Sequence, residues 1–249
     1  DNETFGFQLE KQFQNVEVLN LGVAGHGLDQ ILLSYTVIGR SFNPDIVVIS
    51  IFPENFWRAT RSFADTGHAK PYFSLDKKGK LILHNVPVPP KYSLKNNQFP
   101  DLIEYNAFES VLMRSQLYRF IKRAMLRLGK NLGWIDPDPT VEWLIGRAIL
   151  KELVKEVRAQ GAAPVLVMVP PDRWMHHTKP TSLQKSMFRF AQREQVYFID
   201  LTPVLQQVVK ESGMTHYYIK DDGHWAAEGH HFVSEILERF LKAHGLVKD

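Results

Sequence analysis

The sequence contains no cysteine among its 249 residues. This absence excludes a thiol nucleophile, a thiolate metal site and disulfide bonds, and it is compatible with both cytosol and periplasm. No apolar run approaches the roughly 20 residues of a transmembrane helix. The ten histidines show no H-x-x-x-H or H-E-x-x-H spacing on a helix, so the sequence predicts neither a metal site nor a cofactor.

A charge excess of either sign is also lacking. Lysine and arginine number 30 against 27 aspartates and glutamates, and this net charge of +3 does not call for nucleic acid as a partner. A signal-peptide pattern is absent as well, because the chain opens on the polar residues Asp1-Asn2-Glu3. Since no methionine precedes them, we expect the sequence to be a fragment of something longer.

What the chain does contain is an alternation of apolar strand-like and helix-like segments. Such alternation is typical of an α/β fold, and strands that are apolar nearly throughout indicate a parallel sheet buried on both faces. Strands are predicted at 16–23, 45–52, 164–169 and 196–200. Helices are predicted at 4–13, 28–41, 141–160, 181–194 and 203–211, followed by a last helix with the apolar stripe Phe232, Ile236, Leu237, Phe240 and Leu241.

Residues 57–140 interrupt this rhythm. They contain a predicted hairpin (72–75 and 81–83), a proline-rich loop and a helix predicted over 103–128. We interpret the segment as an insertion, or lid, within a single domain that spans 1–249. The predicted helix and the residues just after it carry many basic residues, which indicates a solvated face or, alternatively, contact with a membrane surface or an anionic polymer: Arg114, Arg119, Lys122, Arg123, Arg127 and Lys130.

Candidate site residues lie on predicted loops, either after a strand or before the last helix. His224 follows Asp221 and Asp222 on a loop before the last helix, a place suited to a catalytic base with an orienting carboxylate. The alternative is a helix cap or a surface histidine. Gly25 belongs to a glycine-rich turn after the first predicted strand, and Asn55 follows the second. Each could bind a ligand at this edge of the sheet, or be only a tight turn and a turn-capping side chain.

The motif Asn20-Leu21-Gly22-Val23-Ala24-Gly25, then Asn55, then the Asp/His pair resembles the SGNH (GDSL-type) hydrolase superfamily. The resemblance implies a flavodoxin-like three-layer α/β/α fold and a serine nucleophile. It also implies an oxyanion hole that includes Gly25 and Asn55, with His224 as the base. The common spacing Asp-x-x-His selects Asp221 as the acid. Asp-x-His-Trp, which resembles the alginate O-acetyltransferase branch, selects Asp222, and Trp225 favours that choice.

The chain departs from this family in its first block, Gly-Asp-Ser, which should lie upstream of Asp1. No serine within the chain fits, because Ser34 and Ser41 fall in a predicted helix and Ser50 in a buried strand. Pro53 and Phe56 also replace the outer residues of the family's Gly-x-Asn-Asp block. The missing block carries the first, central strand of a sheet ordered 2-1-3-4-5. We therefore expect residues 1–249 to be poorly stable and inactive alone.

The function predicted from this resemblance is a serine esterase. It would act on a small-molecule or glycan O-acyl ester with a serine supplied from upstream. The alternatives are an O-acyltransferase that transfers acetyl groups to a polysaccharide, a non-catalytic carbohydrate-binding relative, and an α/β domain with a chance motif. Substrate, compartment and oligomeric state are left open by the sequence.

Overall fold

The computed structural model of the chain describes residues 2–89, 100, 102–103, 111–112, 115–132 and 140–247. Its main sheet has three parallel strands in the order β1 (Ile46–Ile51), β4 (Ala163–Met168) and β5 (Tyr197–Asp200). These runs are apolar and rich in β-branched residues, which favours a strand covered on both faces. The order agrees with the last three strands of the arrangement that the family resemblance implies.

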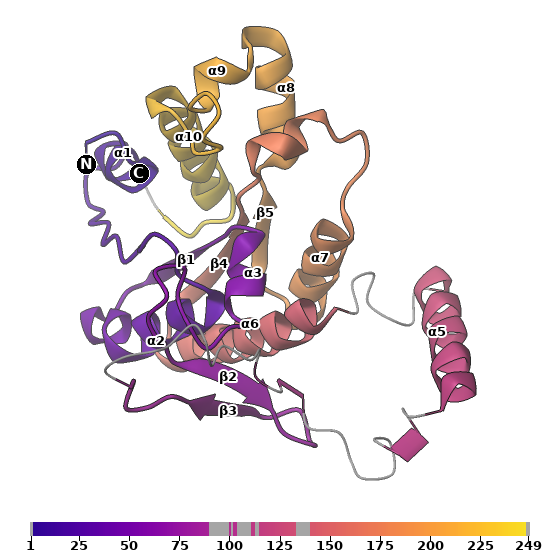
Figure 1. Ribbon diagram of the computed structural model, residues 1–249. Helices are drawn as coiled ribbons and strands as arrows, with labels where there is room; N and C mark the ends of the chain where they lie inside the picture. The colour runs from indigo at the N-terminus through magenta and orange to yellow at the C-terminus, as the bar shows by residue number, and fades with distance from the viewer. Residues whose placement is uncertain are drawn as a thin grey trace.

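Helices cover both faces of this sheet, so the predicted three-layer α/β/α fold is confirmed. Figure 1 shows α6 on one face and α10 on the other. Their apolar stripes meet the sheet in one core, in which Leu153, Leu166 and Leu237 are almost completely buried. The main helices are α1 (Phe5–Lys11), α2 (Leu28–Val37), α6 (Val141–Ala159), α7 (Ser182–Glu194), α8 (Thr202–Ser212) and α10 (Ala227–Ala243).

Short helices follow the carboxyl ends of the strands, and the sequence did not predict them. They are α3 (Glu54–Arg58) after β1, a 3₁₀ helix (Asp172–His176) after β4, and α9 (Met214–Tyr217) before the loop that carries His224. A further 3₁₀ turn, Gly39–Phe42, replaces the end of the helix predicted over 28–41. The two short helices directly after β1 and β4 lie at the carboxyl edge of the sheet, whereas the 3₁₀ turn precedes the amino end of β1 and α9 follows α8.

The strand predicted at 16–23 is wrong, because this segment is irregular. Leu19, Leu21 and Val23 expose 48%, 39% and 57% of their surface. An apolar run becomes a strand only where a neighbouring strand accepts and donates its backbone hydrogen bonds. Within the described residues none pairs with 16–23, and β1 pairs with β4 alone.

The segment 57–140 contains the predicted hairpin, formed by antiparallel strands β2 (Tyr72–Leu75) and β3 (Leu81–His84). The helix predicted from Ile103 does not begin there, because Ile103 forms a β-bridge with Leu75. The helix α5 (Gln116–Asn131) is found instead. The proline-rich residues 90–99 lie outside the described residues, and the interpretation of 57–140 as a lid stays a prediction. None of the helices in the described ranges combines the length and apolar content needed to cross a bilayer.

Candidate functional site

The loop that carries His224 is a short, hydrogen-bonded turn between α9 and α10. The Ile219 N–H donates to the His224 carbonyl at 2.8 Å, and the Ala226 N–H donates to the Tyr217 carbonyl at 2.9 Å. Tyr218 and Trp225 form a β-bridge between these two bonds. The loop is therefore closed at its base, and the turn from 219 to 224 presents its side chains outward.

Within this turn the structure brings Asp222, and not Asp221, to His224. The Asp222 Oδ1 contacts His224 Nδ1 and also accepts a hydrogen bond from the His224 backbone N–H at 3.2 Å. These bonds from His224 hold the pKa of the Asp222 carboxyl below its ordinary value. Asp221 lies in the left-handed region with φ of 61°. With Nδ1 donating to a carboxylate, the remaining ring nitrogen, Nε2, is the basic one.

His224 itself is open to solvent. Its side chain is 81% exposed. Among the described residues, no hydrogen bond reaches its Nε2 atom. The imidazole thus has one nitrogen fixed by a carboxylate and the other free to take a proton.

Two aromatic residues anchor the loop to the body. The Trp225 indole is buried and packs edge-on against Phe5 of α1 and His230 of α10, at centroid distances of 6.2 Å and 5.6 Å. The Tyr218 hydroxyl donates to the Pro170 carbonyl, just after β4, at 3.1 Å. Burial raises the pKa of Tyr218 to about 12. Trp225 therefore holds the loop in place and does not offer an open face for a sugar.

Asn55 is fixed at both ends of its amide. Its Oδ1 accepts from the Phe52 N–H at 2.6 Å, and its Nδ2 donates to the His26 carbonyl at 2.7 Å. The side chain is buried at the start of α3. A side-chain amide has two N–H groups, so one remains after the bond to His26. Asn55 thus joins the end of β1 to the glycine turn, and its second amide N–H remains able to donate a hydrogen bond.

The glycine turn has the backbone geometry that only glycine adopts freely. Gly25 has φ of 79°, and a Cβ built there would meet nothing within 4 Å. Gly27 is different, because its Cβ would lie 2.7 Å from the Ala59 backbone nitrogen. The turn therefore packs tightly on the end of α3 at Gly27 and faces open space at Gly25.

Contacts between loops place the candidate residues at the same edge of the sheet. Arg173, in the 3₁₀ helix after β4, forms an ion pair with Glu54 beside Asn55. In the same 3₁₀ helix, Asp172 lies 3.4 Å from where a Cβ of Gly223 would be. The structure thus links Gly25 to Asn55 through His26, and Asp222 to His224 directly. No described contact joins the first pair to the second.

Two polar pairs were missed by the sequence analysis. Asp29 and Lys70 form an ion pair in which both side chains are almost fully buried. Burial raises the pKa of Asp29 and lowers that of Lys70, and each partner's charge opposes that shift. Ser74 and His84 hydrogen-bond across the β2–β3 hairpin at 2.7 Å, but Ser74 is only 4% exposed. Asp29 and Lys70 are 41 residues apart, whereas Ser74 and His84 lie on the two strands of one hairpin, and no sequence motif identifies either pair.

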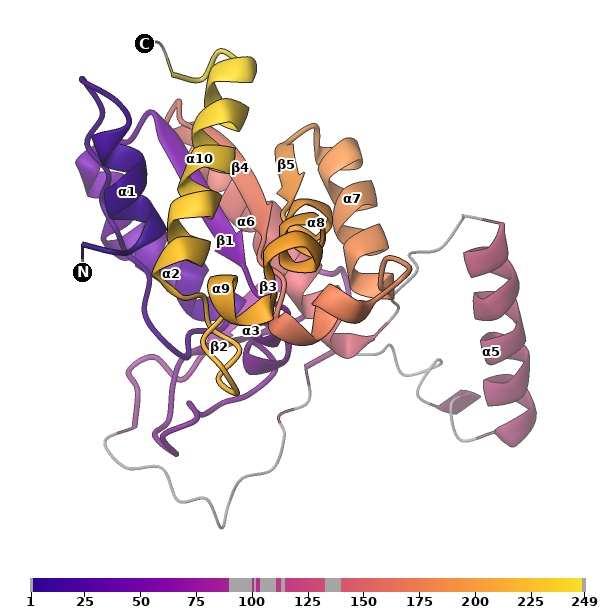
Figure 2. The same ribbon diagram turned by 90° about the horizontal axis from the view of Figure 1, so that it is seen from above.

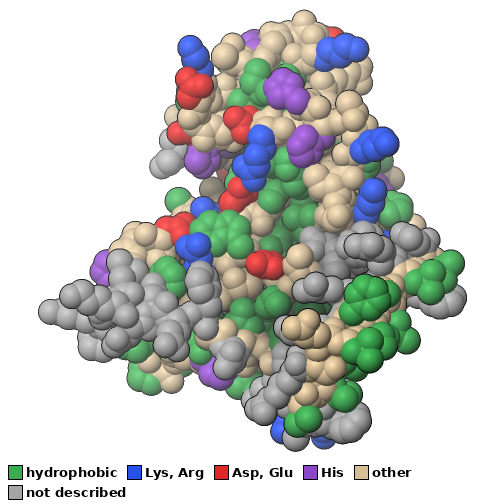
Figure 3. All heavy atoms as spheres, turned by 45° about the vertical axis from the view of Figure 1, so that its right-hand side comes forward, with side chains coloured by type: hydrophobic (Ala, Val, Ile, Leu, Met, Phe, Trp, Pro, Cys, Tyr) green, Lys and Arg blue, Asp and Glu red, His purple; other side chains and the backbone are tan. Residues whose placement is uncertain are grey.

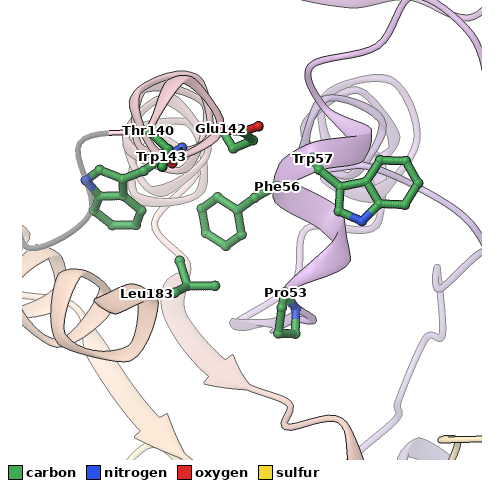
Figure 4. Close-up of a pocket in the computed structure, with 7 residues that line it drawn as sticks. All are labelled: Pro53, Phe56, Trp57, Thr140, Glu142, Trp143 and Leu183. Carbon is green, nitrogen blue, oxygen red and sulfur yellow. Dashed lines mark hydrogen bonds between the residues drawn. The ribbon is translucent and has the colours of Figure 1, made fainter. Parts of the chain in front are cut away.

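A cavity of about 330 Å³ lies between α3 and the starts of α6 and α7. Figure 4 shows Phe56 and Leu183 pointing into the space between these elements. Among the described residues, no contact joins this cavity to His224. Its lining is mainly apolar and consists of Pro53, Phe56, Trp57, Thr140, Glu142, Trp143 and Leu183.

Across the described ranges, no group of three or more histidines, aspartates or glutamates is arranged to hold a metal ion. No protein-family model matches the chain, and comparison with curated proteins finds no match. Among solved structures, the chain is similar to the protein YxiM from Bacillus subtilis, at 19% identity and a TM-score of 0.35. The similar part covers 40% of this chain and 31% of that one. YxiM is thus a weak structural neighbour, and the function is argued below from the site residues alone.

Proposed function

We propose that this chain carries the acid, the base and two oxyanion donors of a serine esterase whose nucleophile lies outside residues 1–249. The observation that supports this most directly is the Asp222–His224 contact. A carboxylate on Nδ1 orients the imidazole and stabilises the imidazolium, while a free, exposed Nε2 is available as a general base. This is the constellation that remains when a Ser-His-Asp triad lacks its serine.

The proposed reaction begins when the upstream serine attacks the ester carbonyl carbon. The His224 Nε2 takes the hydroxyl proton as the new C–O bond forms. The negative charge moves to the carbonyl oxygen, where the remaining N–H of Asn55 and the N–H of Gly25 would stabilise it. One such donor is typically worth about 3–4 kcal/mol of barrier. Collapse of the intermediate expels the alcohol, which receives the proton from His224 and leaves an acyl-serine.

Water then attacks the acyl-serine while His224 accepts one of its protons; the bond to the serine oxygen breaks, His224 returns the proton to that oxygen, and the free acid leaves. The 81% exposed His224 side chain favours water as the acceptor over a bound sugar hydroxyl. The Asp222–His224 pairing fits the Asp-x-His-Trp spacing of the transferase branch, but the Trp225 indole packs in the core and offers no face on which a glycan acceptor would stack. We therefore place hydrolysis ahead of O-acyl transfer.

The test uses the protein together with the polypeptide that the gene encodes before Asp1, assayed with p-nitrophenyl acetate. We expect His224→Ala to remove activity and Asp222→Asn to lower kcat by about 10³–10⁴-fold. Asp221→Asn is the matched control, because this neighbouring carboxylate does not contact the imidazole, and it should leave kcat within a few-fold of wild type.

Several outcomes would contradict the proposal. One is a His224→Ala variant that retains more than about a tenth of wild-type turnover, since loss of a triad base costs far more. Another is the absence of a Gly-Asp-Ser block before Asp1, which would favour a binding protein. Faster transfer to a glycan acceptor than to water, measured with an acetyl donor, would favour the transferase.

A further inference from the structure

Helix α5 has an apolar stripe that is exposed along its length. Leu117, Phe120, Met125 and Leu128 expose 68%, 70%, 66% and 57% of their surface, and Ile121 exposes 45%. Phe120, Ile121, Met125 and Leu128 follow Leu117 by three, four, eight and eleven residues, which places all five on one side of an α-helix. A contiguous exposed apolar stripe of this kind marks a surface that binds something.

Among the residues that the structure describes, no other element packs over this stripe. Figures 1 and 2 show α5 standing apart from the layered body in two perpendicular views. In Figure 3, green apolar side chains gather over one face of α5 at the lower right. The stripe is therefore available to a partner outside the described chain.

The charge of the surrounding segment narrows the choice of partner. Residues 110–135 contain six basic residues and no acidic one. The rest of the chain has 24 basic and 27 acidic residues, so the excess of positive charge is concentrated in this segment. The partner must accept an apolar stripe and a dense positive charge together.

We propose that α5 lies in the surface of an anionic phospholipid bilayer, with its apolar stripe at the headgroup–acyl boundary and its basic residues among the headgroups. Amphipathic helices with basic polar faces and Phe or Leu on the other bind membranes in this way. The 16 residues of α5 reach only about 24 Å, which is shorter than a bilayer core, so the helix lies on the membrane and does not cross it.

Two other partners fit less well. A second copy of α5 would bring two clusters of like charge together, which costs free energy. A nucleic-acid backbone would match the charge but gives an exposed Phe and Leu stripe nothing to bury against. An anionic bilayer satisfies both requirements. This inference does not depend on the esterase proposal.

The test measures co-sedimentation of the full chain with vesicles of phosphatidylcholine alone or with phosphatidylglycerol added. We expect binding to the anionic vesicles only, with at least about tenfold loss when salt rises from about 0.05 M to about 0.5 M. The triple variant L117Q/F120Q/M125Q should also lose at least about tenfold in binding, since its apolar stripe is gone. V37Q/F188Q, which changes exposed apolar residues on α2 and α7, is the matched control and should bind like wild type.

Circular dichroism on each variant checks that the fold is retained, and all five substituted positions are exposed. The inference is overturned if the full chain does not bind anionic vesicles, or if the triple variant binds as well as wild type. It is also overturned if the chain forms a dimer that the triple variant abolishes while no vesicle binding is seen. Esterase activity does not enter any of these measurements.

Discussion

At the scale of single residues, Tyr218 attaches the loop that carries His224 to the end of β4. Its hydroxyl donates to the Pro170 carbonyl, and the ring is almost completely buried. Because burial disfavours the phenolate, the pKa of Tyr218 is raised to about 12. In the unfolded chain the phenol would ionise near its ordinary value of 10.0.

This difference predicts a loss of stability in alkali. A group whose pKa is raised by folding stabilises the protein fully below its unfolded pKa and loses this contribution as pH rises towards the folded pKa. We expect the free energy of unfolding to fall by up to about 2–3 kcal/mol between pH 10 and about 12. Urea unfolding at several pH values measures it. In the Tyr218→Phe variant, the free energy of unfolding should no longer fall over this pH range, whereas in the neighbouring Tyr217→Phe variant it should fall as in wild type. An identical pH profile for Tyr218→Phe and wild type would contradict the assignment.

The choice between Asp221 and Asp222 shows what the sequence can and cannot predict at this scale. The acidic pair before His224 is visible in the sequence, but both spacings occur in the family that it resembles. The choice depends on backbone conformation. With Asp221 in the left-handed region and Asp222 accepting from the His224 N–H, only Asp222 is turned towards the imidazole. Such a turn is set by the bonds at its base, which no local pattern reports.

At the scale of elements, the glycine turn between 22 and 27 depends on a positive φ at Gly25. Alanine at this position would have room, but a left-handed backbone costs an L-residue roughly 1–2 kcal/mol. The strain would be relieved by rotating the peptide whose N–H is proposed to meet the oxyanion.

We therefore expect Gly25→Ala to lower both stability and the esterase kcat of the extended protein. Gly79→Ala is the matched control, because Gly79 has φ of 77°, is equally open and lies in the β2–β3 turn. It should lose about as much stability, on the order of 1 kcal/mol, without a change in kcat. Thermal unfolding and p-nitrophenyl acetate turnover of both variants provide the comparison. Equal effects on kcat would remove Gly25 from the oxyanion hole.

The strands show how well the apolar pattern of the sequence, taken alone, predicts secondary structure. The strands predicted at 45–52 and 164–169 are apolar nearly throughout, and β1 and β4, which form there, pair with each other. The run 16–23 has a similar pattern but forms no strand. Apolar composition predicts that a segment can be buried, whereas hydrogen bonding to a neighbour decides whether it is a strand. Likewise, the helix predicted over 103–128 fails at Ile103, whose bridge to Leu75 is a long-range contact.

At the scale of the whole molecule, the side of the sheet beyond β1 is open among the described residues. The unpaired edge of β1 and the irregular, exposed segment 16–23 together make this the least stabilised part of the α/β body.

Hydrogen exchange should measure the difference in stability between the segment 16–23 and the central strand β4. We expect the amides of 19–23 to exchange with little protection in the 1–249 chain, while those of β4, which is paired on both sides, exchange only through global unfolding. In the extended protein, the 16–23 amides should gain at least about tenfold protection if a further strand pairs there. Protection of 19–23 equal to that of β4 in the 1–249 chain would show that the segment already has a partner.

The acid and the base of the proposed site are separated by one residue, Gly223, on a single closed turn. In a site whose acid comes from a different element, any displacement of the base also breaks its alignment with the acid. Here the two side chains travel together, so motion of the turn changes only their joint distance to the nucleophile. The segment between Tyr217 and Ala226 therefore contains both the acid and the base in a fixed relative geometry. A protein engineer could graft it between two helices of another α/β scaffold and need to adjust only one alignment.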